Sequence, residues 1–276
     1  SPIPSLPLDP ENIASTGLYY TYVKGSWNLT AQMEANKHIP AISDGGMMPG
    51  VYEVGNNLAL GPTTRDLGLV GYWKFDEGSG TTANDSSGFA NSGTLTNGPI
   101  WQSGSSCKKG ACLSFNSANY ISVTDSNSLN IQSNTFTISG WFKPNIDVTS
   151  MIDTYPILVI KRPWLVGGYA AHFDKSNGRL NVQYCSSGSC PGVSSITAFS
   201  GGFWYYYVGT FDGDKLKVYI NGAIESTSGS QSAKIGSSAG VALTIGQDFE
   251  GVIDDVRVYN RALTEDEIKV IYGATQ

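Results

Sequence analysis

Four cysteines are the residues whose spacing points most directly to covalent chemistry. Cys107 and Cys112 enclose four residues, and Cys185 and Cys190 repeat that spacing. Several of the enclosed residues are small, so a disulfide at a hairpin tip is geometrically reasonable for each pair. A zinc site made of four thiolates is the alternative, although such sites normally prefer tighter spacing. The spacing and the even number favour two disulfides, which indicate an oxidising compartment outside the cytoplasm.

A carboxylate near the C-terminus could bind a metal ion. Alternation along a strand expected at 251–259 places one set of side chains on a single face, which we expect to point inward: Val252, Asp254, Val256 and Val258. A buried carboxylate needs a partner, so Asp254 requires either an arginine or backbone amides, or calcium. Asp76 and Asp85 could add carboxylates, and glycine-rich loops could add the carbonyl oxygens that calcium also takes. Calcium held by Asp76, Asp85 and Asp254 is therefore one of two interpretations that the sequence leaves open.

Pairs of carboxylates suited to catalysis are not evident in the sequence. Glycoside hydrolysis commonly needs two carboxylates that face the same cleft. The nearest candidates are Asp248 with Glu250, expected in a loop, and Asp254 with Asp255, which as neighbours on a strand point to opposite faces. The two histidines lie far apart in the sequence, with no nucleophile motif near them. We expect no catalytic residues and no enzymatic activity.

A loop between two expected strands contains residues suited to binding a sugar. Sugars are commonly held by an aromatic face and a few hydrogen-bonding groups in a shallow groove. Arg162, Trp164 and Tyr169 lie close together in the sequence, beside the flexible pair Gly167 and Gly168. These three side chains are the predicted ligand-binding residues, and the arginine would suit an acidic glycan. The alternative is that Trp164 simply packs against the edge of a sheet.

Composition and charge exclude several classes of partner. The net charge is −6, from 17 basic and 23 acidic residues, and no basic stripe could follow a phosphate backbone, so we expect no nucleic acid. No apolar stretch approaches the roughly 20 residues that span a bilayer, so no membrane span is expected in this sequence. With 33 glycines and only 14% charged residues, the chain suits many short strands joined by tight turns.

Period-two alternation predicts a long series of strands after Leu69. The predicted strands are 70–75, 111–115, 120–123, 136–142, 157–160, 180–184, 204–211, 215–220, 242–246 and 251–259. The tryptophans at 73 and 141 and the aromatic run 203–207 are interpreted as core and strand residues. One helix is expected, from Thr264 to about Tyr272, with acidic residues in its first turn. This order favours a mostly β, antiparallel two-sheet sandwich.

The N-terminal part differs from the rest of the chain. The proline-rich segment 1–10 reads as a linker, and short strands are expected at 18–23, 27–31 and 50–55. Three short strands cannot form a deep core by themselves. These strand segments, together with 32–34 and Pro49, resemble the globular part of a bacterial type IV pilin or pseudopilin. The family's long apolar N-terminal helix is missing here, so the resemblance implies a truncated pilin-like module over residues 1–62.

The larger part, residues 63–276, resembles the laminin G-like branch of the concanavalin A-like lectin/glucanase group. Three segments carry the resemblance: the opening 71–95, the central strand 136–144 and the closing strand 249–263. The resemblance implies a jelly-roll sandwich of the concanavalin A type. Members of this group often hold calcium near positions that correspond to Asp76, Asp85 and Asp254, which supports the calcium interpretation.

Together the two resemblances predict a modular, pilus-associated adhesin that is extracellular, on the cell surface or the pilus. Its lectin-like domain would bind carbohydrate or glycoprotein, assisted by calcium. Its pilin-like module would contact other pilin subunits through the missing N-terminal helix. Two alternatives stay open: a structural filament subunit whose sandwich binds no glycan, and a glycoside hydrolase.

Overall fold

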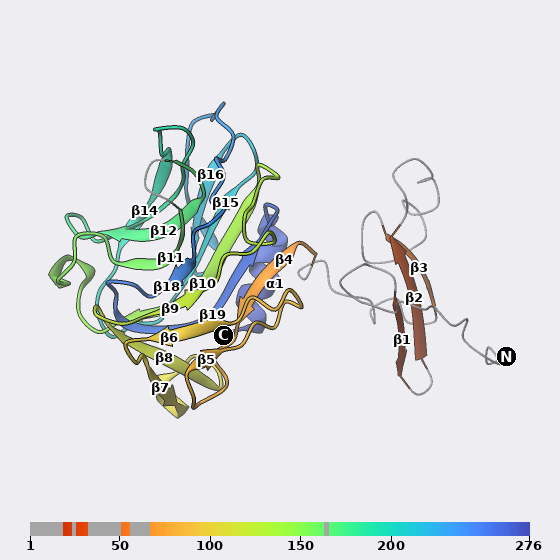
Figure 1. Cartoon of the computed structure of the whole chain (residues 1–276), viewed down its shortest axis with the longest axis horizontal. Helices are drawn as coiled ribbons and strands as arrows, with labels where there is room; N and C mark the ends of the chain where they lie inside the picture. The colour runs from red at the N-terminus through yellow and green to blue at the C-terminus, as the bar shows by residue number, and fades with distance from the viewer. Residues whose placement is uncertain (1–18, 24–25, 33–50, 56–66, 163–165) are drawn as a thin grey trace. The chain divides into compact units, whose positions relative to one another are not determined.

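The chain divides into two compact units, Ser1–Leu67 and Gly68–Gln276. A computed structural model describes residues 19–23, 26–32, 51–55, 67–162 and 166–276 (Figure 1). In the first unit, β1 (Tyr19–Val23), β2 (Ser26–Gln32) and β3 (Val51–Gly55) form an antiparallel sheet in that order. The three predicted strands are therefore present. The predicted linker at 1–10 lies outside the described residues, and the pilin-like nature of this unit stays a prediction.

The second unit contains two large antiparallel sheets, called sheet I and sheet II here. Sheet I has the order β17 (Ala223–Thr227), β16 (Leu216–Ile220), β15 (Tyr205–Phe211), β10 (Phe136–Pro144), β19 (Glu250–Tyr259), β8 (Ala111–Asn116) and β7 (Ile100–Ser103), with β4 (Leu69–Trp73) also paired to β19. Sheet II has the order β14 (Gly192–Ala198), β13 (Arg179–Tyr184), β12 (Tyr169–Asp174), β11 (Ile157–Lys161), β18 (Leu243–Ile245), β9 (Tyr120–Val123), β6 (Gly93–Thr96) and β5 (Thr82–Ala83). Two short 3-10 helices, η5 (Gly104–Ser106) and η6 (Val148–Ser150), interrupt the loops. This arrangement confirms the mostly β, two-sheet prediction and is consistent with a jelly roll.

Apolar side chains from both sheets meet in one core. Trp73 is fully buried there, and its indole Nε1 donates a hydrogen bond to the carbonyl of Asn91 at 2.9 Å. Phe142 packs edge-on against Phe173 and Phe199, with ring centroids 5.2 and 5.1 Å apart, and so joins sheet I to sheet II. Aromatic pairs of this kind add to the burial of their area and fix the distance between the sheets.

The outer face of sheet I is covered by the C-terminal helix α1 (Glu265–Ala274). Ile268 and Ile271 of the helix pack on aromatic residues of the sheet that include Trp141 and Tyr206. Thr264 caps the helix in a capping box, which confirms its predicted start. In the described part of the chain, no helix has the length and apolar character needed to cross a membrane.

A bulge in the central strand β19 changes which side chains face the core. The pairing of β19 with β10 shifts between Ser139 and Trp141, and Asp255 at the shift has a φ of 57°. One extra residue reverses the alternation, so Ile253 before the bulge and Val256 after it both enter the core. The prediction that Val252, Asp254, Val256 and Val258 share one inward face is therefore wrong. Asp254 lies with Val252 on the outer face of sheet I.

Several strands escaped sequence-based prediction, and one predicted core residue is exposed. The strands that were not predicted are β5, β6, β7, β12, β14 and β17. β12 contains Ala170 and Ala171, whose side chains have little strand preference, so the sequence suggested a loop up to Tyr169. Phe203 lies in the loop before β15 with 63% of its surface exposed, so its assignment to the core was wrong.

The close approach of the two sheets depends on Gly209. A Cβ atom at this position would lie 2.5 Å from both methyl groups of Val182 on the facing sheet. We predict that Gly209→Ala lowers the free energy of unfolding by about 1–3 kcal/mol, because the buried neighbour must move. Gly229→Ala is the matched control, since no atom lies within 4 Å of its added methyl group. If denaturant unfolding gives both variants the same free energy of unfolding as the wild type, this account of the packing is wrong.

Candidate functional site

The outer face of sheet II is lined by small and polar side chains. Residues paired across neighbouring strands point to the same face, and one such row crosses the sheet from β6 to β14. In order, the row is Thr94, Ser122, Thr244, Ile160, Ala170, Gln183 and Gly192. Their chain neighbours, such as Ile121 and Val182, enter the core. Unlike sheet I, whose outer face packs on α1, sheet II therefore offers hydroxyl and amide groups at its surface.

The polar groups are most concentrated around His172 on β12. His172 is paired with Asn181 on β13, which is paired in turn with Ser194 on β14. The Nδ1 atom of His172 lies 3.4 Å from the amide nitrogen of Gln183, and Asn181 donates a hydrogen bond to the Ser194 hydroxyl at 3.1 Å. The half-exposed ring of Tyr155 meets the imidazole edge-on, with centroids 5.8 Å apart. An aromatic ring beside uncharged hydrogen-bonding groups is the usual composition of a sugar site.

His172 is uncharged at neutral pH. Burial lowers its pKa to about 4, and the nearby Arg162 guanidinium acts in the same direction, while Asp174 opposes both. The side chain is only 8% exposed, so the charged form would lose much of its hydration. The imidazole therefore presents one donor and one acceptor rather than two donors.

The three ligand-binding residues predicted from sequence have different positions in the structure. Arg162 follows β11, and its Nη1 atom lies 3.2 Å from the Sγ atom of Cys185. Tyr169 is fully buried, stacks on Phe136 and donates its hydroxyl to the carbonyl of Leu129. No surface of Tyr169 is left for a ligand, which corrects that prediction. Trp164 lies outside the described residues.

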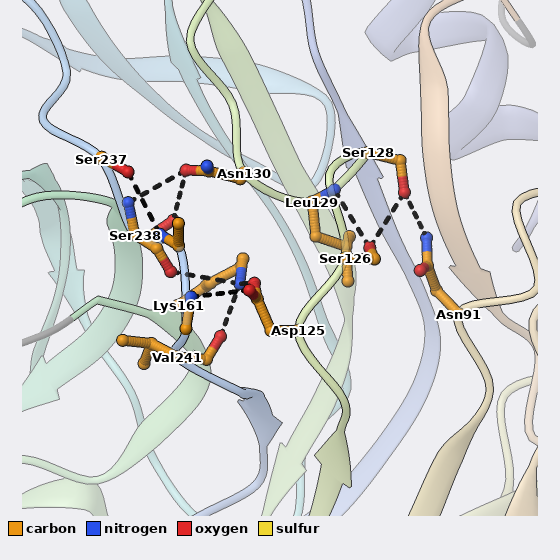
Figure 2. Close-up of polar contacts among 12 residues, drawn as sticks. Asn91, Asp125, Ser126, Ser128, Leu129, Asn130, Lys161, Ser237, Ser238 and Val241 are labelled. Atoms are coloured by element: carbon orange, nitrogen blue, oxygen red, sulfur yellow. Dashed lines mark hydrogen bonds and ion pairs between the residues drawn. The ribbon is translucent and has the colours of Figure 1, made fainter.

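An ion pair between the buried Lys161 and the partly exposed Asp125 fixes the end of β11 (Figure 2). Lys161 has no exposed surface, and its ammonium group contacts Asp125 at 2.5 Å and the carbonyl of Val241 at 2.5 Å. Asn130 accepts hydrogen bonds from the backbone and the hydroxyl of Ser238 on the same loop. A buried ammonium is tolerated only with such partners, so these contacts hold the loop before β18 against β11.

Both predicted disulfides are present. Cys107 is bonded to Cys112 and Cys185 to Cys190, each pair within a single loop. The second disulfide lies against Arg162, and the Cys185 backbone exchanges hydrogen bonds with Gly168 and Gly236. This loop therefore supports the same end of sheet II as the Lys161 ion pair does.

The first disulfide loop covers Asp254. The backbone amides of Lys108 and Lys109 both donate to its Oδ2 atom at 3.1 Å, whereas the buried Oδ1 atom has no hydrogen-bond partner. Burial, together with the carboxylates of Asp255 and Asp76, raises the pKa of Asp254 to about 8, although the two amides act in the opposite direction. The carboxyl group thus favours a bound proton or a cation at Oδ1.

Asp76 lies near Asp254, but Asp85 has a different role. Asp76 accepts a hydrogen bond from the amide of Ala111 in the same disulfide loop. Asp85 accepts four hydrogen bonds, listed by donor as the amides of Tyr72, Ser87 and Asn91 and the hydroxyl of Ser87. Asp85 thus orders its own loop. Within the described residues, no group of three or more His, Cys, Asp or Glu side chains could hold a metal ion.

The carboxylate pairs considered for hydrolysis have structural partners. Asp255 forms an ion pair with Arg257 at 2.9 Å. The Oε1 atom of Glu250 accepts a hydrogen bond from the amide of Ile152. Asp248 occupies a turn with a φ of 60°, and burial together with Asp153 raises its pKa. Asp255 and Glu250 are thus held by structural contacts, whereas Asp248 has a second carboxylate nearby.

Comparison with known proteins identifies the fold. The profile of the concanavalin A-like lectin/glucanases superfamily matches residues 115–269. No curated protein matches the chain by sequence. Similar solved structures include the binding domain of Paraclostridial Mosquitocidal Protein 1, at 18% identity and a TM-score of 0.63, over 76% of this chain and 53% of that one.

Two further structures have sugars named in their descriptions. Domain 4 of AbnA, a GH43 extracellular arabinanase from Geobacillus stearothermophilus, was solved with arabinotriose; it is 21% identical, with a TM-score of 0.58 over 75% of this chain and 98% of that domain. The botulinum neurotoxin serotype D ligand-binding domain was solved with N-acetylneuraminic acid; it is 16% identical, with a TM-score of 0.59 over 76% of this chain and 51% of that one. This chain thus spans about half the length of the toxin domains, and these identities establish the fold alone. Several of the similar structures are binding domains by their descriptions, and one is a domain of an arabinanase.

The raised pKa of Asp254 predicts a specific effect of pH on stability. An unfolded aspartate ionises near pH 4, whereas folded Asp254 keeps its proton to about pH 8, so this group makes stability fall as pH rises through that window. We predict that Asp254→Asn gains stability relative to the wild type between these values, on the order of a few kcal/mol by pH 8.

The comparison must be made between variants at each pH in denaturant unfolding. His172 acts in the opposite direction, since its lowered pKa costs stability as pH falls from about 6.5 towards 4. The exposed Asp214→Asn serves as the control and should follow the wild type. A difference between Asp254→Asn and wild type that does not change with pH would contradict the assignment.

Proposed function

Because the chain belongs to the concanavalin A-like lectin/glucanase superfamily, we propose that its sandwich binds carbohydrate or glycoprotein on the outer face of sheet II. The observation that carries the proposal is the group of uncharged polar side chains around His172. Gln183 and Asn181 lie beside the imidazole, Ser194 follows on the next strand, and Tyr155 supplies an aromatic ring at the edge. Sheet I is less suitable because α1 and the Cys107–Cys112 loop cover much of its outer face.

Sugar ligands in proteins of similar fold support this proposal. The arabinanase domain was solved with arabinotriose and the botulinum neurotoxin domain with N-acetylneuraminic acid. Their low identity gives no residue-level correspondence, so the position of the site rests on the side chains of this chain. Binding at one such shallow site is expected to be weak, and display of many copies would strengthen it.

We place the proposed calcium ion at Asp254, with Asp76 as the second carboxylate. The buried Oδ1 atom of Asp254, which lacks a hydrogen-bond partner, fits a cation ligand. Asp85 is left out, since its own loop uses both of its oxygens. A cation here would stabilise the Cys107–Cys112 loop on sheet I and would not contact a sugar at His172. Calcium should then raise the unfolding midpoint of the wild type and leave Asp254→Asn unchanged.

The proposal includes display on a type IV pilus, with the sandwich exposed for adhesion outside the cell. Its support is the sequence resemblance of the first unit to pilins, together with two disulfides that suit an oxidising compartment. We predict that antibodies against the Gly68–Gln276 unit label filaments of the producing cells in immunogold electron microscopy. Label confined to the cell body would contradict the association with pili.

A glycan array tests the binding function with the whole chain, in calcium and again in chelator. We predict binding to a defined class of oligosaccharide, with arabinotriose among the probes. Gln183→Ala should weaken it about tenfold, because loss of one hydrogen bond to a ligand costs roughly 1–1.5 kcal/mol. His172→Ala should have a similar effect.

Thr227→Ala on the exposed β17 is the matched control and should bind like the wild type. Unchanged binding by a well-folded Gln183→Ala variant would place the site elsewhere. No binding to any glycan would contradict the proposal and favour a structural role in the filament.

A further inference from the structure

The side chains around His172 carry hydrogen-bonding groups, and the exposed Arg179 beside them lies opposite the carboxylate of Asp174. We infer that this site selects neutral sugars over sugars that carry a carboxylate. The inference rests on the proposed function, since it names the ligand class of the same site. It also reverses the expectation from sequence that Arg162 would suit an acidic glycan.

The groups at the centre of the site match sugar hydroxyls. Gln183 and Asn181 each have an amide with donors and an acceptor, and Ser194 has a hydroxyl with both. His172 is neutral and only 8% exposed, so it contributes one donor and one acceptor. A sugar hydroxyl also donates and accepts, so it can pair with any of these groups. A carboxylate can only accept hydrogen bonds. The acceptor atoms of these side chains would face it without a hydrogen-bond donor, which disfavours binding.

The nearby cations contact other groups or have a carboxylate as their neighbour. Carboxylates are usually recognised by an arginine fork or an accessible lysine. The Nη1 atom of Arg162 lies 3.2 Å from Cys185 Sγ and 3.6 Å from Cys190 Sγ, so the guanidinium faces the disulfide. Lys161 is buried against Asp125, and Lys175 donates to the carbonyl of Ile152. Arg179 is exposed and lies opposite Asp174 in the strand register, so a carboxylate beside it offsets its charge.

Carboxylates border the same surface. Asp174 follows His172 by two residues on β12 and therefore points to the same face. The hydroxyl of Ser176 donates to Asp174 and lowers its pKa, so this carboxylate is ionised at neutral pH. Asp153 precedes Tyr155 by two residues and lies close enough to Asp248 to raise the pKa of that group. An anionic ligand would meet like charges on this side.

A small residue keeps the surface shallow on one side of Gln183. Its partner on β14 is the exposed Gly192, whereas its partner on β12, Ala170, is fully buried. A Cβ atom at residue 192 would lie 2.7 Å from Asn181 Oδ1 and 3.1 Å from Gln183 Cβ, so a side chain there would crowd both amides. A flat sugar ring can therefore approach the amides with the Tyr155 ring at its side.

Binding to matched pairs of glycans tests the inference. The pairs are a lactose-terminated glycan with and without terminal N-acetylneuraminic acid, and an oligogalacturonide as methyl ester and as free acid, within an array of other neutral and acidic pairs. Calorimetry with the whole chain should give at least tenfold tighter binding to the neutral member of each pair that binds. Asp174→Asn should reduce this ratio of affinities, because it should strengthen the binding of the acidic member alone. Thr227→Ala should leave the ratio unchanged.

Equal or tighter binding to the acidic members would overturn the inference and leave the proposed function intact. Absence of binding to both members of every pair would instead overturn the proposed function. Gln183→Arg supplies a second check, because an added guanidinium should shift the ratio towards the acid. Denaturant unfolding confirms that each variant is folded before its ratio is compared.

Discussion

Each of the two sheets buries one face in a shared core, and what covers the other face determines where a ligand can bind. On sheet I, Trp141 and Tyr206 pack beneath α1, and the Cys107–Cys112 loop covers Asp254. On sheet II, the outer face carries threonine, serine, glutamine and histidine side chains at its surface. The molecule therefore has one face that contributes to stability and one that is suited to recognition. The disulfide loops and the Lys161 ion pair lie at the edges of these two faces, where they hold the neighbouring loops in place.

Alternation and turn signals predicted the fold class, cysteine spacing and number favoured both disulfides, and capping residues predicted the helix at Thr264. They failed where the backbone departs from regular geometry. The bulge at Asp255 reverses the alternation within β19. It could not be predicted from the residue type, because Asp255 adopts its positive φ without being a glycine. Asp254 was therefore predicted on the wrong face, although backbone amides, one of the partners considered for it, do contact its carboxylate.

Only part of the candidate site could be predicted from the sequence. Tyr169 looked like a loop aromatic because the weak strand β12 was missed, and the structure places it in the core. His172 and Gln183 were missed because their proximity depends on the register of β12 and β13, a contact that arises only once the strands pair. The alternation within 179–184 did indicate which residues of β13 face outward, because the apolar Leu180, Val182 and Tyr184 alternate with polar residues.

The central claim is that a glycan binds to the outer face of sheet II. The most direct measurement is a map of backbone amide chemical shifts, by nuclear magnetic resonance, on addition of a saturating neutral oligosaccharide. The account predicts that the largest changes fall at Tyr155, His172, Gln183 and Ser194, with α1 unaffected. Changes concentrated on α1 or around the Cys107–Cys112 loop, with none at His172, would contradict it.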